Sequence, residues 1–177
     1  MKEKFTICIF TENQVGLLHR LTTIFTRRHI NIESLTTSEA ELDGVHRFTI
    51  SVECEEEQVE KLSKQLSKQV GTLEADYYRE EETVWQEIAL FKVSTNAFFN
   101  GTQLEEIIRS HRTRILEIEP NYVVLEQTGY KEDTQTLFEK LKPFGILEFV
   151  RSGRVSISKT NVPFKKEKET ILKKEKH

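Results

Sequence analysis

Residues 10–35 read FTENQVGLLHRLTTIFTRRHINIESL, and the interpretation of the whole chain starts from this stretch. Its apolar residues recur at helical spacing, which predicts an amphipathic helix over residues 17–29. A turn around Gly16 precedes this helix, and an extended segment opened by Asn31 follows it. The first N–H groups of a helix have no partner within the helix, and they lie at the positive end of its dipole. The start of this helix is therefore suited to hold a small carboxylate.

Two asparagines flank the predicted helix: Asn13 lies in the turn before it, and Asn31 lies just before the next strand. An amide side chain can donate to a carboxylate or accept from an ammonium, so a small amino acid suits both. Taken singly, Gly16 and the asparagines are also ordinary turn and cap residues, and only their joint spacing indicates a site. We interpret the stretch as a sensor of a small amino acid and the chain as a regulator rather than an enzyme.

Residues 1–80 alternate between strand and helix patterns. Asp43-Gly44 marks a hairpin turn between two of the strands. Strands are expected at residues 4–10, 30–39, 45–53 and 72–79. The apolar stripe of the second helix comprises Val59, Leu62, Leu66 and Val70. The order β-α-β-β-α-β predicts a ferredoxin-like domain, an antiparallel sheet with both helices on one face. The other face has no cover in this half, so we expect it to pack on a partner, the second domain or a ligand.

The pattern repeats after the acidic segment Glu80–Glu82, which we interpret as a linker. Strands are expected at residues 84–95, 114–119, 122–127 and 145–153, and helices at 103–111 and 132–142. Whether residues 154–158 continue the last strand is left open. The fold class is therefore α+β, with two ferredoxin-like βαββαβ domains in tandem at residues 1–80 and 83–160. Residues 161–177 are rich in lysine and glutamate, and we expect them to form a charged, disordered tail.

Composition excludes several classes of protein. The formal net charge is -3, so we expect no general affinity for nucleic acid or acidic membranes. The apolar run at the N-terminus is too short for a signal peptide, and no stretch reaches the ~20 apolar residues of a membrane helix. Cys8 and Cys54 are the only cysteines, which favours a reducing cytoplasm over a disulfide framework.

Other single residues have ordinary explanations beside functional ones. His19, His29 and His46 lack the spacing of a metal site, so no metal is expected. Arg20 suits either a partner contact or the solvent face of the helix, and Trp85 suits either a partner surface or the seam between domains. We find no nucleophile elbow, P-loop or dinucleotide-binding glycine motif, so no catalytic residue is assigned.

Two motifs in the first half carry a family resemblance. Asn13-x-x-Gly16-Leu17-Leu18-x-Arg20 and Asn31-Ile32-Glu33-Ser34-Leu35 resemble an ACT domain, and more narrowly the small regulatory subunit of acetolactate synthase, also called acetohydroxyacid synthase. In the second half, residues 86–93, QEIALFKV, resemble the strand that opens that family's C-terminal domain. Residues 150–153, VRSG, resemble its closing motif. The resemblance covers residues 3–158, and the tail extends beyond it.

The resemblance implies a non-catalytic subunit with an ACT domain at residues 1–80 and an ACT-like domain at 83–160. Such a subunit binds and activates the large catalytic subunit and confers feedback inhibition by a branched-chain amino acid, usually valine, in valine, leucine and isoleucine biosynthesis. No cofactor is expected in this chain, because thiamine diphosphate, magnesium and FAD would belong to the catalytic subunit. Leu17 stands where the family usually has a small residue, and His19 stands where serine is common.

In the resembling family the effector lies between the two ACT domains of a homodimer. The matching effector-binding positions here are Asn13, Gly16, Leu17, Leu18, Asn31 and Ile32. Two alternatives stay open. The ACT half alone would also fit a stand-alone amino-acid sensor of another pathway. The ferredoxin-like plan is shared with an RNA-binding module, although the third strand, VHRFTISVE, lacks that module's aromatic pattern.

Overall fold

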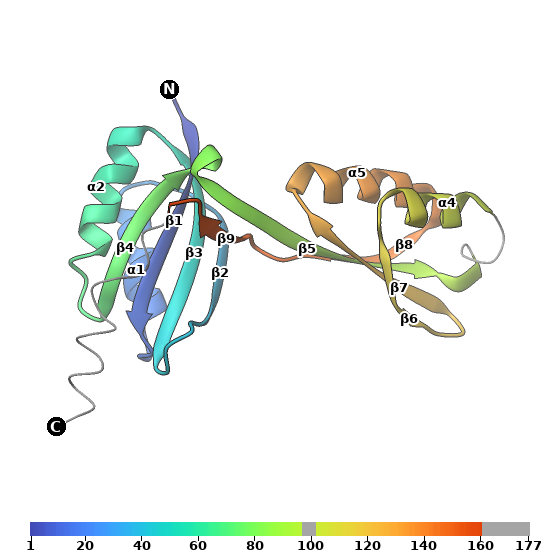
Figure 1. Ribbon diagram of the computed structural model, residues 1–177, viewed down its shortest axis with the longest axis horizontal. Coiled ribbons are helices and arrows are strands. Elements are labelled where there is room, and N and C mark those ends of the chain that lie inside the picture. The colour runs from blue at the N-terminus through green and yellow to red at the C-terminus, as the bar shows by residue number, and fades with distance from the viewer. Residues whose placement is uncertain (97–101, 161–177) are drawn as a thin grey trace. The chain divides into compact units, whose positions relative to one another are not determined.

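The computed structural model describes residues 1–96 and 102–160 of the chain. These residues form two compact units (Figure 1). Of the described residues, the first unit comprises Met1–Val84 and residues 156–160, and the second comprises those of Trp85–Val155. The predicted tail, residues 161–177, lies outside the described residues.

The first unit has the predicted order of elements. It contains β1 (Glu3–Glu12), α1 (Leu17–Arg27), β2 (Ile32–Glu39), β3 (Val45–Cys54), α2 (Glu56–Leu66) and β4 (Thr72–Arg79). Its four strands are antiparallel and lie in the order β2-β3-β1-β4. This arrangement confirms a ferredoxin-like domain, with β2 and β4 at the two edges of the sheet.

The core of the first unit lies between its sheet and its two helices. Ile7 on β1 is opposite Ile50 on β3 and Tyr77 on β4, which places all three on the same face of the sheet. Leu21 from α1 and Leu62 from α2 are fully buried against this face. Side chains alternate between faces along a strand, so every second residue of β1 enters this core.

The second helix is shorter than its predicted apolar stripe. Val59, Leu62 and Leu66 are fully buried, as expected. Val70 is 72% exposed, and its assignment to the stripe is wrong. The helix ends at Leu66, and the chain then turns through Gly71, whose φ of 86° suits glycine.

The opposite face of the first sheet carries Cys8, which is paired with Thr49 on β3 and with Asp76 on β4. Strand β9 (Val155–Ser158) brings the chain back to this face. Ser156 accepts a hydrogen bond at its carbonyl oxygen from Arg47, and its Oγ lies 3.7 Å from Cys8 Sγ. The end of the segment that the sequence assigned to the second domain therefore covers part of the first sheet.

The second unit repeats the plan of the first. It contains β5 (Thr83–Ser94), α4 (Thr102–Ser110), β6 (Arg114–Ile118), β7 (Tyr122–Gly129), α5 (Lys131–Leu141) and β8 (Ile146–Arg151). The strand order is β6-β7-β5-β8, and β9 pairs with β5. Short 3-10 helices lie at Glu80–Glu82 and Lys142–Phe144. The tandem ferredoxin-like prediction is confirmed in this unit as well.

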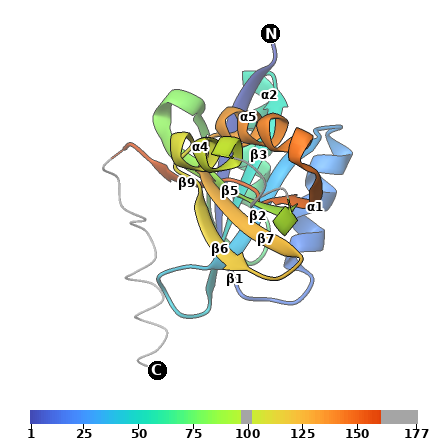
Figure 2. The ribbon, with the colours of Figure 1, turned by 90° about the vertical axis from the view of Figure 1, so that its right-hand side faces the viewer.

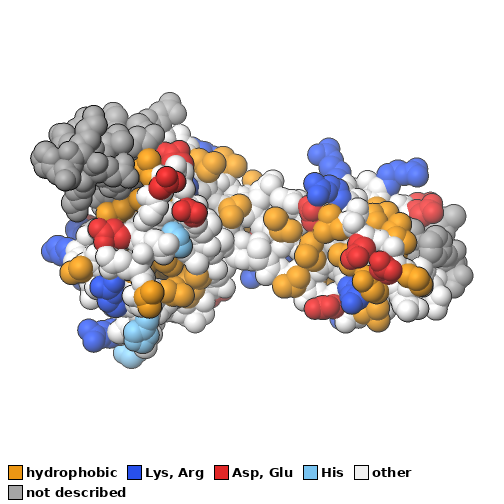
Figure 3. All heavy atoms as spheres, turned by 90° about the horizontal axis from the view of Figure 1, so that it is seen from below, with side chains coloured by type: hydrophobic (Ala, Val, Ile, Leu, Met, Phe, Trp, Pro, Cys, Tyr) orange, Lys and Arg blue, Asp and Glu red, His pale blue; other side chains and the backbone are white. Residues whose placement is uncertain are grey.

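The two faces of the second sheet differ in their cover. Helices α4 and α5 lie on one face, as Figures 1 and 2 both show, and they bury Phe91 and Leu125. On the other face, Ile88 is 45% and Val150 is 54% exposed. Apolar side chains gather on the second unit among charged ones in the view of Figure 3. No helix of residues 1–96 or 102–160 is long and apolar enough to cross a membrane.

Candidate functional site

The turn between β1 and α1 is held by the two neighbouring turns at the same end of the sheet. The N–H of Asn13 donates to the carbonyl oxygen of Gly44 in the β2–β3 hairpin at 2.9 Å. The N–H of Glu12 donates to Gly71 in the α2–β4 turn, also at 2.9 Å. Within the turn, Arg20 donates from Nη2 to Gln14 Oε1 at 3.3 Å. Arg20 is half-buried and so belongs partly to the turn itself.

Gly16 directs the chain into α1. Its φ of 81° and ψ of −2° lie in the left-handed region, and an added Cβ would meet nothing within 4 Å. Glycine is therefore required by the backbone conformation rather than by a close neighbour. The N–H groups of Leu18 and His19 lie in the first turn of α1 and have no intrahelical partner. Gly16 has no side chain that could cap them. This helix start can accept a carboxylate from outside the fold.

Leu17 and Leu18 face opposite environments at this helix start. Leu17 is 2% exposed and belongs to the core of the first unit, with Cδ1 near Gly71. Leu18 is 44% exposed. Of the two adjacent leucines, only Leu18 presents its side chain to a molecule arriving from solvent.

Asn31 and Ile32 lie at the far end of the same sheet. Ile32 is opposite Val52, which pairs with Phe5 near the start of β1. Asn13, in contrast, follows Glu12 at the end of β1. The helix α1 alone, with 11 residues, spans about 16 Å between the two groups. Asn31 is exposed, and its Nδ2 donates to Glu33 Oε1 at 3.2 Å.

The six predicted effector-binding residues therefore form two separate groups in one chain. Asn13, Gly16, Leu17 and Leu18 lie at one end of α1, while Asn31 and Ile32 lie past its other end. An amino acid such as valine is shorter than the helix that separates them. One protomer alone cannot bring Asn13 and Asn31 onto a single ligand of this size.

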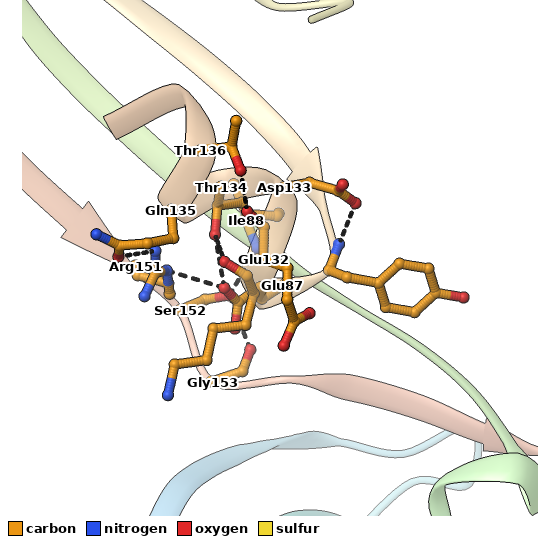
Figure 4. A network of polar contacts seen from close by, with 12 residues as sticks. Glu87, Ile88, Glu132, Asp133, Thr134, Gln135, Thr136, Arg151, Ser152 and Gly153 are labelled. Carbon is orange, nitrogen blue, oxygen red and sulfur yellow. Dashed lines mark hydrogen bonds and ion pairs between the residues drawn. The ribbon is translucent and has the colours of Figure 1, made fainter. Parts of the chain in front are cut away.

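The motifs of the second half meet in one polar network, which is buried at Glu87 and exposed at Ser152 (Figure 4). Glu87, from the QEIALFKV segment, forms an ion pair of 2.8 Å with Arg151 Nε from the VRSG segment. Thr134 on α5 donates to Glu87 Oε1 at 2.9 Å. Ser152 and Ile88 exchange hydrogen bonds of 2.8 and 2.9 Å. These motifs therefore fasten β8 to β5 and α5, and their role in the second unit is structural.

The remaining candidates from the sequence also have defined surroundings. Trp85 is 7% exposed, with the guanidinium of Arg154 3.8 Å from its ring centroid and Tyr130 in edge contact at 4.8 Å. It is therefore an internal residue of the second unit rather than an exposed anchor for a partner. Within residues 1–96 and 102–160, no three His, Cys, Asp or Glu side chains are grouped in a way that could hold a metal ion.

Comparison with known proteins also divides the chain between residues 74 and 86, and the second match runs on to residue 160. Residues 7–74 match a family model described as an AHAS small subunit-like ACT domain. Residues 86–160 match one described as the small subunit of acetolactate synthase. The first unit is thus an ACT domain, and the second matches the C-terminal domain of acetolactate synthase small subunits.

Full-length relatives extend these matches. The acetolactate synthase small subunit of Bacillus subtilis is 36% identical over 160 residues, covering 90% of this chain and 91% of that protein. The small subunit of Mycolicibacterium smegmatis is 32% identical over 154 residues, covering 87% of this chain and 90% of that protein. The crystal structure of the Thermotoga maritima small subunit has the same fold, with a TM-score of 0.81 at 24% identity over 90% of this chain and 99% of the other.

The class defined by these observations is that of tandem ferredoxin-like regulatory proteins with an N-terminal ACT domain. More narrowly, the chain belongs to the family of acetolactate synthase small subunits, which are regulatory rather than catalytic subunits.

Proposed function

We propose that this chain binds the large catalytic subunit of acetolactate synthase, raises its activity, and makes it sensitive to feedback inhibition by valine or another branched-chain amino acid. Membership of the small-subunit family supports the proposal that the chain binds a catalytic subunit. In this role, thiamine diphosphate, magnesium and FAD are cofactors of the catalytic subunit. The cytoplasm is the compartment of this role, and the free thiols of Cys8 and Cys54 suit its reducing conditions.

The separation of Asn13 from Asn31 carries the proposal of a shared effector site. Strand β2 is an edge of the first sheet, so a second copy can pair with it. In a two-fold pair of antiparallel β2 strands, the start of one strand lies beside the end of the other. The end of β2 leads into the hairpin whose Gly44 binds Asn13. Asn31 of one protomer therefore comes beside the Asn13 turn of its partner, which makes two equivalent sites.

Each proposed site offers matched chemistry to an aliphatic amino acid. The free N–H groups at the start of α1 hold the carboxylate. The amide oxygens of Asn13 and of the partner's Asn31 accept hydrogen bonds from the ammonium. The exposed Leu18 and half-buried Ile32 provide apolar contact for a branched side chain. Because the ligand contacts both protomers, its binding changes the stability of their interface, and a coupling of ~1–3 kcal/mol suffices for regulation.

The proposal is tested by calorimetric titration of the purified chain with valine, leucine and isoleucine, beside Asn31→Ala. Saturable binding that is lost in the variant is expected. The same proteins are then added to the purified catalytic subunit. Wild-type chain should raise its activity and make it valine-sensitive, whereas Asn31→Ala should raise activity without restoring sensitivity. Unchanged activity and unchanged valine response after addition of the wild-type chain would refute the proposed role.

A further inference from the structure

A pocket of about 700 Å³ opens on the face of the first sheet that α1 and α2 leave free. Cys8, Phe10 and Tyr78 from the sheet line it. Its walls include residues of the β2–β3 hairpin and of the segment 157–160, and all of them belong to the first unit. It is distinct from the Asn13 and Asn31 groups, and none of the predicted effector-binding residues lines it.

The lining of this pocket is strongly acidic. Its carboxylates are those of Glu39, Glu41, Glu74 and Asp76. The only cationic side chain among the lining residues is Arg47. Its guanidinium donates to the carbonyl oxygen of Ser156 and to Cys8 Sγ, and it lies 5.3 Å from the centroid of the Phe10 ring. Arg47 is therefore engaged with the pocket wall, and the excess of carboxylates favours a cationic occupant.

The chain itself leads from this pocket into a basic segment. Thr160, the last described residue, lines the pocket. The residues that follow it, 161–168, read NVPFKKEK and contain three lysines against one glutamate. At ~3.3–3.6 Å per residue, eight residues reach up to about 29 Å, which is enough to return across the pocket. A tether this short holds the segment at an effective concentration of the order of millimolar.

We propose that residues 161–168 bind in this pocket of their own chain, with lysines against its carboxylates. Phe164 supplies an apolar group for Leu42, Val45 and Ile157, which also line the pocket. Pro163 favours an extended conformation at Val162. Composition alone predicts a disordered tail, whereas the acidic pocket beside Thr160 offers a binding site for the first part of this segment.

The position of the segment is tested in the full-length protein with a water-soluble carbodiimide. This reagent joins a lysine to a carboxylate only when the two are in contact. Peptide mapping is expected to find Lys165, Lys166 or Lys168 joined to the pocket carboxylates within one chain. The exposed pairs Lys61–Glu57 and Lys64–Glu60, both at 2.5 Å, serve as internal positive controls. Mixing chains with light and heavy nitrogen separates links within one chain from links between copies.

The effect of binding is tested by alkylation of Cys8, which lines the pocket. Wild-type protein is compared with a proximal variant, Lys165→Glu/Lys166→Glu/Lys168→Glu. Its matched control is Lys173→Glu/Lys174→Glu/Lys176→Glu, which changes the net charge equally. The proximal variant should raise the Cys8 rate about tenfold, while the control leaves it unchanged. Cys54, at 2% exposure in the core, reports whether the fold has changed.

A charge-reversal rescue completes the design. Adding Glu74→Lys/Asp76→Lys to the proximal variant should restore protection of Cys8. Equal Cys8 rates in wild type and the proximal variant would overturn the proposal, as would cross-links found only between copies or an equal effect of the distal control. None of these readouts involves valine or the catalytic subunit, so the result is independent of the proposed function.

Discussion

Asn13 and Asn31 lie at opposite ends of helix α1, one in the turn before it and the other past its C-terminal end. The strand register shows the same separation, because Glu12 is opposite Val45 while Ile32 is opposite Val52 at the other end of β3. Two asparagines that suggest one binding site in the sequence are therefore separated by the length of α1 in the folded chain. The effector site that we propose joins them across two protomers.

The proposed effector site, shared between two protomers, predicts complementation between two defective variants. Asn13→Ala alone and Asn31→Ala alone should each abolish tight valine binding, because every site in either dimer lacks one amide. In a dimer that contains one chain of each kind, one site has both asparagines and the other has neither. Random exchange of equal amounts should therefore restore about a quarter of the wild-type sites, measured by calorimetric stoichiometry. If the mixture binds no more valine than its components, the two asparagines do not share a ligand across the interface.

Substitution of the two adjacent leucines at the start of α1 should have different effects: one on the free energy of unfolding, the other on valine binding. Leu17 is 2% exposed, and Leu17→Ala is expected to lower the free energy of unfolding by about 2–4 kcal/mol because it leaves a cavity. Leu18 is 44% exposed, and Leu18→Ala should lower it by less than ~0.5–1 kcal/mol while weakening valine binding. Urea unfolding followed by circular dichroism gives the first quantity, and calorimetry gives the second. Equal losses of stability would contradict the opposite orientations of the two side chains.

The parts of this fold that could be predicted are those with a strong local period. Ile7 and Ile9 alternate with Thr6 and Cys8, and the first pair enters the core as expected for a strand. Leu21, with its helical neighbours, forms the buried face of α1 for the same reason. Such a pattern indicates that one face of a strand or helix is buried. Packing of these buried faces against one another builds the βαββαβ domain.

Contacts between distant residues could not be read in this way. Arg47 and Ser156 are 109 positions apart, and no local pattern indicates that β9 returns to the first sheet. Glu87 and Arg151 belong to two separate motifs in the sequence, and no local pattern predicts that they are partners in one buried ion pair. The separation of Asn13 from Asn31, in contrast, follows already from the helix predicted between them, because an α-helix rises 1.5 Å per residue.

The Glu87–Arg151 pair should stabilise the second unit specifically. The two side chains are only 8% and 18% exposed, so Glu87→Ala leaves a largely buried guanidinium without its carboxylate. We expect a loss of about 2–4 kcal/mol in the free energy of unfolding. The matched control is Glu57→Ala, which removes an ion pair whose carboxylate is 75% exposed and should change the free energy of unfolding far less.

The fluorescence of Trp85 provides the measurement for this comparison. It is the only tryptophan in the chain, and it is buried in the second unit beside Arg154 and Tyr130. Its unfolding transition in urea should move to lower denaturant concentration in Glu87→Ala and stay in place in Glu57→Ala. A wild-type midpoint in Glu87→Ala would show that the ion pair does not hold β5 to β8.

Tyr78 should make the first unit sensitive to alkaline pH. Burial, followed by the nearby charge of Asp76, raises the pKa of the Tyr78 phenol above its ordinary value. The folded state therefore favours the protonated phenol more than the unfolded chain does. Its contribution to stability is complete below the unfolded pKa of about 10 and is lost as the pH rises through the raised folded value.

Tyr78→Phe cannot ionise at this position, so its stability should fall less steeply between about pH 9 and 11 than that of wild type. Urea midpoints from circular dichroism across this range measure the difference, with Tyr130→Phe in the second unit as the control. Parallel pH profiles for wild type and Tyr78→Phe would show that the phenol ionises alike in the folded and unfolded chains.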